Sequence, residues 1–316
     1  MNRVPWAATV VLLALPLSAQ DTRTVTEPVR PTACVTLDAQ LAIVGDTTLA
    51  AADEARLDTP RIQAAINGCA AGQAVVLRAQ GAKRAFVSGA LQLKTGVTLV
   101  VDTTAVLFAS RDPRQFDTAP GACGVLSQGP RGCKPLIAAD RADHSGVMGP
   151  GTIDGRGWAA LLRGGPTWWE MAEQARDTKY SQQNPRLIVT SRSNDFTLYR
   201  LTLRNSPNFH VVIERADGFT AWGVIINTPR GARNTDGIDP SGSRNVSIVH
   251  SYIHTGDDNI AIKAGGAGAA RNITVANSHF YNGHGVSVGS ETDGGGGAIL
   301  VRDVTFVGTD NALRIK

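Results

Sequence analysis

The second half of the chain carries acidic, basic and imidazole side chains at a nearly regular spacing. Hydrolysis of a glycosidic bond needs one protonated carboxyl group for the leaving oxygen and one ionised carboxylate that activates water or attacks. Crowded carboxylates can supply both, because like charges held close together raise at least one pKa. Two cations nearby would bind an acidic group on the substrate, which indicates a uronic-acid sugar. The set is Asp236, Asp257, Asp258, His284, Arg314 and Lys316.

Each of these residues also has an ordinary structural interpretation. An aspartate in a turn usually bonds to nearby backbone, and two cations alone would form a solvated face. Hard oxygen ligands on loops can also hold a calcium ion. The aspartates that this alternative concerns are Asp236, Asp239, Asp257 and Asp258. The histidines that are interpreted as structural are His210, His250, His254 and His279.

The elements that must position the reactive set follow a repeat after Leu187. Short phrases alternate apolar with small or polar residues, as half-buried strands do. They span 196–198, 219–221, 246–248, 273–275 and 299–301, so the steps are 23, 27, 27 and 26 residues. A second series of apolar residues consists of Ile238, Ile260, Val286 and Leu313, which are spaced 22, 26 and 27 residues apart.

A period of 22 to 27 residues with two or three short strands per turn predicts a solenoid. The Leu-x-x-Leu-x-Leu spacing of leucine-rich repeats is missing, and a β-propeller blade needs about 40 residues. The predicted fold class is therefore all-β, a parallel β-helix. One amphipathic stretch, 58–69, predicts a helix with Asp58 or Thr59 as N-cap and Pro60 in the first turn. This helix would cover the open apolar end of the solenoid.

The register of the repeat brings the reactive set together. Asp236, Asp258 and His284 each stand two positions before an aligned apolar residue, so they would lie on three successive coils along one edge. Neighbouring coils are about 4.8 Å apart, so the whole set would converge within roughly 10–15 Å. On the last phrase the two cations have the opposite parity to Leu313 and Ile315. They would therefore leave the core on the same wall.

Four short motifs follow one another along these coils: Asn234-Thr-Asp236, Gly256-Asp-Asp258, Gly283-His-Gly285 and Arg314-Ile-Lys316. In this order and with about this spacing they resemble the polygalacturonases of glycoside hydrolase family 28. The resemblance extends from about Cys34, through Ile153-Asp-Gly155, to the last residue. It implies a right-handed parallel β-helix and an inverting hydrolysis of α-1,4-linked galacturonic acid in pectin, without a metal or other cofactor.

The resemblance also implies a role for each motif. Asp257 looks like the general acid, and Asp236 and Asp258 resemble the pair that activates water. His284 would tune and orient the acid. The residues expected to bind or support the substrate are Asn234, Gly283, Arg314 and Lys316. Because the first and last motifs are intact, a homogalacturonan substrate is favoured over rhamnogalacturonan.

Other classes of protein remain as alternatives. Another pectic-polymer hydrolase, including one for rhamnogalacturonan, would use the same chemistry. A β-helical pectate lyase would need calcium and a basic residue for the α-proton, and the order of the motifs argues against it. A non-catalytic β-helix would bind carbohydrate without cleaving it. The segment 155–185, with Trp158, Trp168 and Trp169, resembles an insertion of bacterial members that would wall a sugar subsite or pack in the core.

The first 19 residues predict a signal peptide, with Arg3, an apolar run over 6–17 and a small-residue cleavage site at Ser18 and Ala19. The run is too short to span a membrane. Residues 20–316 then form one β-helical catalytic domain, whose C-terminal coils are expected to be missing because family members continue beyond the last motif. Export favours disulfides, and the local pairing is preferred. It joins Cys34 to Cys69 and Cys123 to Cys133.

Composition bounds the remaining classes. The chain has 316 residues, 42% hydrophobic and 18% charged, so it can bury a large core and is not disordered. A net charge of +4 is too mild for a dedicated nucleic-acid binder. The predicted signal peptide and the family resemblance imply a secreted or periplasmic protein, expected to be a monomer, whose partner is pectic polysaccharide (polygalacturonate). No nucleic acid, no membrane after signal cleavage and no metal are expected.

Overall fold

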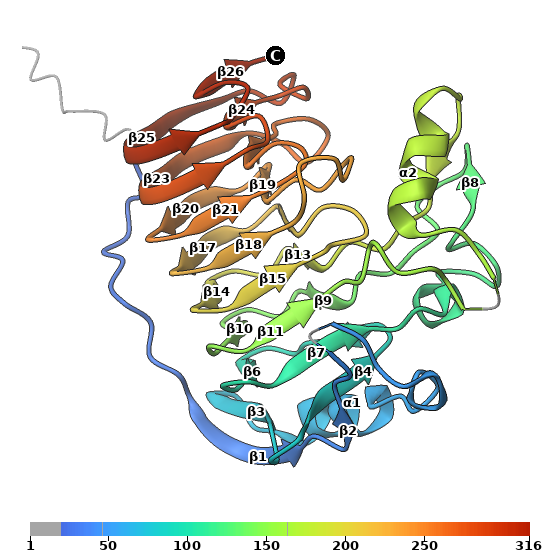
Figure 1. Ribbon diagram of the computed structural model, residues 1–316. Coiled ribbons are helices and arrows are strands. Elements are labelled where there is room, and N and C mark those ends of the chain that lie inside the picture. Colours follow the sequence, from blue (N-terminus) through green and yellow to red (C-terminus); the bar gives the residue numbers. More distant parts are fainter. Residues whose placement is uncertain (1–19, 46, 163) are drawn as a thin grey trace, which may run out of the picture.

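The computed structural model describes residues 20–45, 47–162 and 164–316, so the predicted signal peptide lies outside the described residues. Successive coils stack along one axis, from the N-terminal coils at the lower end of Figure 1 to the C-terminal coils at its upper end. The predicted parallel β-helix with a helix near its start is confirmed. Neighbouring strands on successive coils are parallel and in register, except that the first strand of the second face, Leu41–Ala42, is antiparallel to its neighbour.

Each coil contributes strands to three faces. The first face contains β1 (Thr32–Asp38), β3 (Gln73–Arg78), β6 (Val97–Val101), β10 (Gly146–Met148), β14 (Phe196–Tyr199), β17 (Asp217–Trp222) and β20 (Arg244–Val249). The second contains β2 (Leu41–Ala42), β4 (Lys83–Ser88), β7 (Val106–Ala109), β11 (Thr152–Asp154), β15 (Thr202–Arg204), β18 (Ile225–Asn227) and β21 (Tyr252–His254). Two long strands turn the corner between these faces: β23 (Ala270–Tyr281) and β25 (Gly296–Val307).

The third face is a separate sheet. It contains β5 (Leu91–Gln92), β9 (Ile137–Asp140), β13 (Ile188–Ser191), β16 (Val211–Glu214), β19 (Ile238–Ser241), β22 (Ile260–Ile262), β24 (Val286–Val288) and β26 (Leu313–Ile315). Outside the coils, the described residues form two short 3-10 helices, two α-helices and a small antiparallel pair of strands. They are η1 (Ala51–Asp53), α1 (Thr59–Gly68), η2 (Pro113–Phe116), β8 (Leu126–Ser127), α2 (Trp168–Arg176) and β12 (Ser181–Gln182).

The predicted register of both series is confirmed. On the first face Ala221 pairs with Ile248, which pairs with Val275 on the next coil. On the third face Ile260 pairs with Val286. The inward members of these pairs are fully buried, so identical positions of successive coils stack into one continuous apolar core.

The last strand departs from the parity argument. Leu313 and Ile315 were expected to face the core, but they are 58% and 77% exposed. They lie on β26, which pairs only with β24 in the part of the chain that the structure describes. The two side chains are exposed because no described strand covers the far side of β26. The pairing of β26 with β24 nevertheless has the predicted register.

The N-terminal end of the core is covered as predicted. Helix α1 begins at Thr59, has Asp58 as its N-cap residue and buries Ile62 and Ile66 against the first coils. The Asp58 carboxylate does not cap its own helix; it accepts hydrogen bonds from the Arg61 side chain and a backbone amide of β4. The predicted disulfide between Cys34 and Cys69 joins β1 to the end of this helix.

A buried ion pair fastens the segment before α1 to the third coil. The guanidinium of Arg156 is 2% exposed and donates to both carboxylate oxygens of Glu54, at 2.8 and 2.9 Å. It also donates from Nε to the Ala109 carbonyl at 2.8 Å and lies over the Phe108 ring. Arg111 adds a second, longer contact of 3.2 Å to Glu54. The two ends of this pair are 102 residues apart in the sequence.

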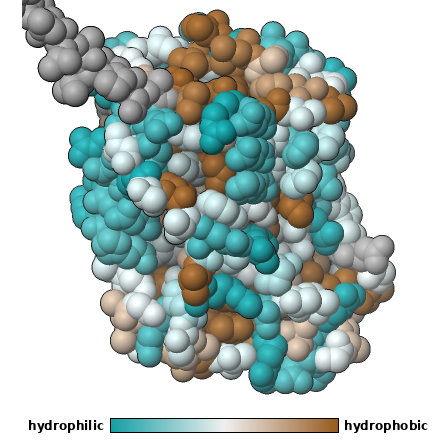
Figure 2. Space-filling view, turned by 90° about the vertical axis from the view of Figure 1, so that its left-hand side faces the viewer, coloured by the Kyte–Doolittle hydropathy of each residue, from teal (hydrophilic) through white to brown (hydrophobic). Residues whose placement is uncertain are grey.

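Residues 20–31 form a strap along the outside of the first face, visible as the blue segment at the left of Figure 1. The Asp21 amide donates to Thr274 Oγ1, and the Asp21 carboxylate accepts from Ser247 on the preceding coil. Arg23 donates to the Phe219 carbonyl, and Tyr199 donates to Glu27. Figure 2 looks at this side, where hydrophilic residues cover much of the surface and hydrophobic ones gather over the last coils.

The structure contains a helix that the sequence analysis did not predict. Helix α2 lies in the 155–185 segment and begins with a capping box, in which Thr167 accepts from the Glu170 amide and Glu170 accepts from the Thr167 amide. The Thr-x-x-Glu pattern is a known sequence signal for the start of a helix, but the helix that follows has only nine residues, so no long apolar period supports the signal. Among the described residues, no helix has the length and apolar character that crossing a membrane requires.

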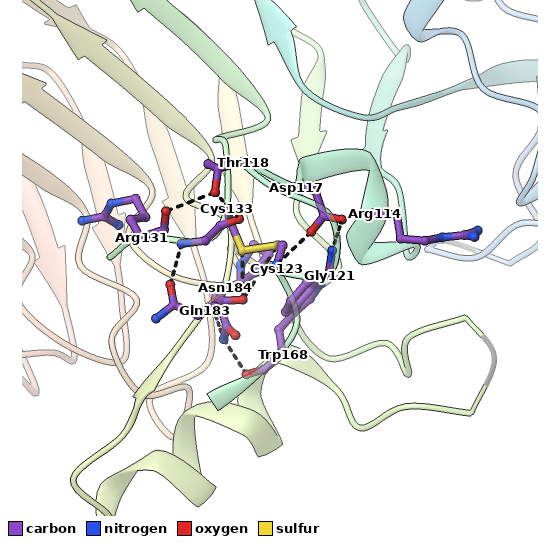
Figure 3. The surroundings of a disulfide bond; sticks show 12 residues. Arg114, Asp117, Thr118, Gly121, Cys123, Arg131, Cys133, Trp168, Gln183 and Asn184 are labelled. Atoms are coloured by element: carbon purple, nitrogen blue, oxygen red, sulfur yellow. Dashed lines mark hydrogen bonds between the residues drawn. A yellow bond between two sulfur atoms is a disulfide. The ribbon is translucent and has the colours of Figure 1, made fainter. Parts of the chain in front are cut away.

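The second predicted disulfide supports this insertion. Cys123 and Cys133 are bonded, which confirms the predicted local pairing. Figure 3 shows the disulfide beside Gln183 and Asn184, two residues that follow β12. Gln183 accepts from the Gly132 amide at 2.7 Å, and Asn184 donates to the Trp168 carbonyl at 2.8 Å. The disulfide loop therefore holds the return of the chain to the solenoid at Gln183, and Asn184 in that return holds the beginning of α2.

Candidate active site

The reactive set lies at the beginning of strands on the third face. Asp236 precedes β19, the Asp257–Asp258 pair precedes β22, and His284 precedes β24. Backbone hydrogen bonds align these positions: the Gly237 amide donates to the Asp258 carbonyl, and the His284 amide donates to the Asp257 carbonyl. The convergence that the register predicted is therefore present, on one edge of three successive coils.

The three carboxylates form a tight group. One oxygen of each of Asp236, Asp257 and Asp258 lies within 4.8 Å of the others. Asp236 and Asp258 are buried, whereas Asp257 is half-buried and reaches solvent. This spacing is compatible with a shared proton, a bound water or a hard cation such as calcium.

Asp258 is held as an ionised carboxylate. Lys316 Nζ lies 2.7 Å from one oxygen, and the other accepts from Ser287 Oγ at 2.6 Å and Arg314 Nη2 at 2.5 Å. Burial alone would raise the pKa of Asp258, but the hydrogen bonds from Lys316 and Ser287 and the two positive charges lower it below its usual value. The predicted pair of cations therefore contacts Asp258 directly.

Asp236 has the opposite electrostatic environment. Burial raises its pKa well above the usual value, and the neighbouring charges of Asp239 and Asp257 raise it further. Lys263 opposes this rise: its Nζ is 2.8 Å from Asp239 Oδ2 and 3.8 Å from Asp236 Oδ2. Among the described residues, Oδ1 of Asp236 and of Asp239 has no hydrogen-bond partner although both atoms are buried. The crowding predicted to raise a pKa therefore acts on Asp236.

His284 lies beside the exposed member of the group. Its Nε2 is 3.8 Å from Asp257 Oδ1, and its Nδ1 contacts Asp310 Oδ2 at 2.7 Å. A carboxylate on Nδ1 fixes the orientation of the ring and favours a proton on that nitrogen. Gly283 makes this approach possible, because a Cβ at its position would lie 2.3 Å from the Asp257 carbonyl oxygen. Its φ of 66° also favours glycine.

Asn234 connects the site to the insertion. Its Oδ1 accepts from Gln182 Nε2 at 2.9 Å, and Gln182 lies on β12. Of the three tryptophans in the insertion, Trp168 is buried in the core, whereas Trp158 and Trp169 line a shallow cavity beside α2. Core packing therefore applies to Trp168, and a sugar subsite at Trp158 and the half-buried Trp169 stays a prediction.

His210 illustrates the structural interpretation of the other histidines. It is fully buried, and its Nδ1 lies 2.9 Å from the Asp236 carbonyl while Nε2 lies 2.8 Å from Thr228 Oγ1. A carbonyl can only accept, so the proton is on Nδ1. Burial lowers the pKa of His210 to about 4, so the ring stays neutral and braces the backbone of Asp236.

Three residues of the site were missed by the sequence analysis. They are Lys263, Ser287 and Asp310; a fourth, Asp239, was considered only as a calcium ligand. Asp239, Lys263 and Ser287 alternate with inward-facing residues of β19, β22 and β24, so parity was a signal for them. Asp310 lies in a loop before β26, where no periodic signal applies.

Comparison with known proteins gives a consistent result. Residues 78–316 match the family described as Glycosyl hydrolases family 28. The chain is 46% identical over 94% of its length to an endo-polygalacturonase of Pectobacterium carotovorum subsp. carotovorum, of which it covers 70%. A polygalacturonase of Ralstonia solanacearum is 44% identical over 82% of the chain, which covers 56% of that relative. The solved polygalacturonase from Erwinia carotovora ssp. carotovora superimposes with a TM-score of 0.86 at 45% identity, covering 94% of this chain and 75% of that one.

Proposed function

The chain belongs to glycosyl hydrolases family 28, and from this premise we propose that it is an endo-acting polygalacturonase that inverts the configuration at the cleaved carbon. It is a glycoside hydrolase, and its substrate is polygalacturonate. The observation that carries the assignment of roles is the group of three carboxylates, in which Asp257 reaches solvent whereas Asp236 and Asp258 are buried. The alternatives of a lyase and of a non-catalytic binder have no comparable support.

The geometry supports the following division of roles. Asp257 is the most accessible of the three carboxyl groups and donates its proton to the leaving glycosidic oxygen, with His284 beside it at 3.8 Å. Asp236 and Asp258 bind the attacking water and accept its proton as the oxygen bonds to the anomeric carbon. Arg314 and Lys316 keep Asp258 ionised and balance the negative charge that an acidic polymer brings to an acidic site.

Product stereochemistry tests the inverting step. The carboxylate oxygens lie within 4.8 Å of one another, which is closer than the roughly 6.5–9.5 Å between carboxyl groups that is usual for inverting enzymes. Inversion therefore rests on family membership. Proton NMR of the first reducing ends released from an α-linked substrate is expected to show the β-anomer. Release of the α-anomer would assign a covalent, retaining mechanism to this site.

The chain-length distribution of products tests endo action. With a chelator present, anion-exchange chromatography of early products from polygalacturonate is expected to show a ladder of saturated oligomers. Saturated monomer or dimer alone would mean exo action. Products that carry an ultraviolet-absorbing double bond, and that disappear with chelator, would mean a calcium-dependent lyase.

The acidic limb of the pH profile tests the role of Asp236. Lys263→Met removes the cation that lowers the pKa of Asp236, so ionisation of Asp236 should require a higher pH. We expect the acidic limb of kcat/KM to move up by about one pH unit or more. Asp239→Asn removes a charge that raises this pKa, so the limb should move down.

Lys263→Arg is the matched control, because it keeps the positive charge and should leave the limb near that of the wild type. Circular dichroism would show that each variant is folded. If the limb stays in place in both Lys263→Met and Asp239→Asn, Asp236 is not the group whose ionisation starts activity.

We also propose that the protein acts outside the cytoplasm, in the periplasm or as a secreted enzyme. The two disulfides and the polymeric substrate support this location.

A further inference from the structure

A second cavity, of about 420 Å³, lies on the third face beside the carboxylate group. Lys263 lines this cavity and also approaches Asp236, so the cavity and the carboxylates share a wall. Phe209 lines it as well and lies just before β16. The other charged residues around it are Arg186, Glu214, Arg215, Asp239 and Glu291.

Arg186 is a buried cation with unused hydrogen-bonding capacity. Its side chain is 12% exposed, and among the described residues its buried Nε has no hydrogen-bond partner. The nearest acidic atom, Glu214 Oε1, is 3.6 Å from Nη1, too far for a hydrogen bond. Burial, followed by the positive charge of Arg131, lowers the pKa of Arg186 to about 10. A guanidinium in this state is poorly satisfied by the protein alone.

Phe209 supplies an apolar floor between two cations. The Arg186 guanidinium carbon lies 4.8 Å from the centroid of the Phe209 ring, and Lys263 Nζ lies 4.3 Å from it. Lys263 is already paired with Asp239 at 2.8 Å, so Arg186 is the cation with donors to spare. An aromatic ring next to an arginine suits a sugar that has an apolar ring face and a carboxylate.

We propose that this cavity is a further subsite, in which the carboxylate of a neighbouring galacturonate unit binds Arg186 while its sugar ring contacts Phe209. This inference rests on the proposed function and names the residue that reads the acidic group of that unit. Glu214 stays close enough to balance part of the Arg186 charge in the free protein without occupying its donors. The subsite therefore discriminates an ionised unit from a methyl-esterified one, because the ester oxygen accepts a weaker hydrogen bond than a carboxylate.

Binding to an inactive variant tests the subsite without relying on turnover. In Asp257→Asn protein, adding Arg186→Met should raise the Kd of a galacturonate oligomer, measured by calorimetry, about 10- to 100-fold. For the same oligomer with its carboxylates converted to methyl esters, the change should be less than about threefold, because the charge-assisted hydrogen bond is then absent. Equal losses on both ligands would overturn the proposal.

Arg192→Met is the matched control. Arg192 lies outside the cavity, is exposed and pairs with Asp140 at 2.8 Å, so its loss should not change the Kd of either ligand. Arg186→Lys keeps the charge without the planar fork and covers the case in which Arg186→Met does not fold. It should weaken binding of the acidic oligomer by a smaller factor and again spare the ester, and an unchanged Kd would contradict the proposal.

Failure of the proposed function has a different signature. If wild-type protein does not hydrolyse polygalacturonate, the function is wrong whatever Arg186 does. If the wild type is active and the two ligands respond alike to Arg186→Met, only the subsite is wrong.

Discussion

Asp257→Asn protein is expected to hydrolyse polygalacturonate at least about 10³-fold more slowly than the wild type, with the loss in kcat. An amide at this position cannot donate a proton to the leaving oxygen. It keeps nearly the same shape, and in the described part of the chain the one ion-pair partner at stake is His284, at 3.8 Å. Initial rates of reducing-sugar release at the pH of maximum activity, with the thermal midpoint of each protein, would measure the effect.

A surface carboxylate provides the control for this variant. Asp140 is 44% exposed and pairs with arginines on the third face, away from the carboxylate group, so Asp140→Asn should retain full activity. Calorimetry should show that Asp257→Asn still binds a galacturonate oligomer. If Asp257→Asn keeps more than a tenth of the wild-type kcat, another residue donates the proton.

The largest expected effect on stability concerns the buried pair of Glu54 and Arg156. Glu54→Ala leaves the Arg156 guanidinium in the core with the Ala109 carbonyl and without its carboxylate. Removing one partner of a buried pair costs about 3–5 kcal/mol, because the remaining charge is buried and uncompensated. We expect the free energy of unfolding, from urea titration followed by circular dichroism, to fall by this amount.

An exposed pair in the same segment is the matched control. Asp53 contacts Arg56 at 2.8 Å, and the arginine side chain is 54% exposed. Asp53→Ala should change the free energy of unfolding by less than about 1 kcal/mol. A loss of similar size for Glu54→Ala and Asp53→Ala would show that the burial of Arg156 contributes nothing specific.

The solenoid could be predicted from the sequence because one spacing is repeated on two faces. Pairs such as Ala221 with Ile248 and Ile260 with Val286 follow directly from that spacing. The positions of Asp236, Asp258 and His284 came from the same register, so the centre of the site was accessible before the structure. In a repeat fold the spacing of a local sequence pattern also tells which distant residues pair, and irregular folds offer no such relation.

The parts that could not be predicted lie outside the repeat. The ion pair of Glu54 with Arg156 joins residues 102 positions apart, and no spacing in the sequence relates them. Helix α2 has only nine residues, so its capping box is a single local signal with no repeat to reinforce it. Lys263 was within reach, because it continues the alternation of β22, but no motif drew attention to it.

The strap over residues 20–31 changes how the coils depend on one another. In a solenoid each coil contacts only its neighbours, so opening can spread stepwise from an end. Here Asp21 reaches Thr274 across 253 positions, and Glu27 reaches Tyr199 across 172. Opening a coil beneath the strap therefore also costs contacts on coils that are not adjacent to it, which links them into one cooperative unit. The strap can dock fully only after the coil of Thr274 has formed, so residues 20–31 are ordered later than coils that follow them in the sequence.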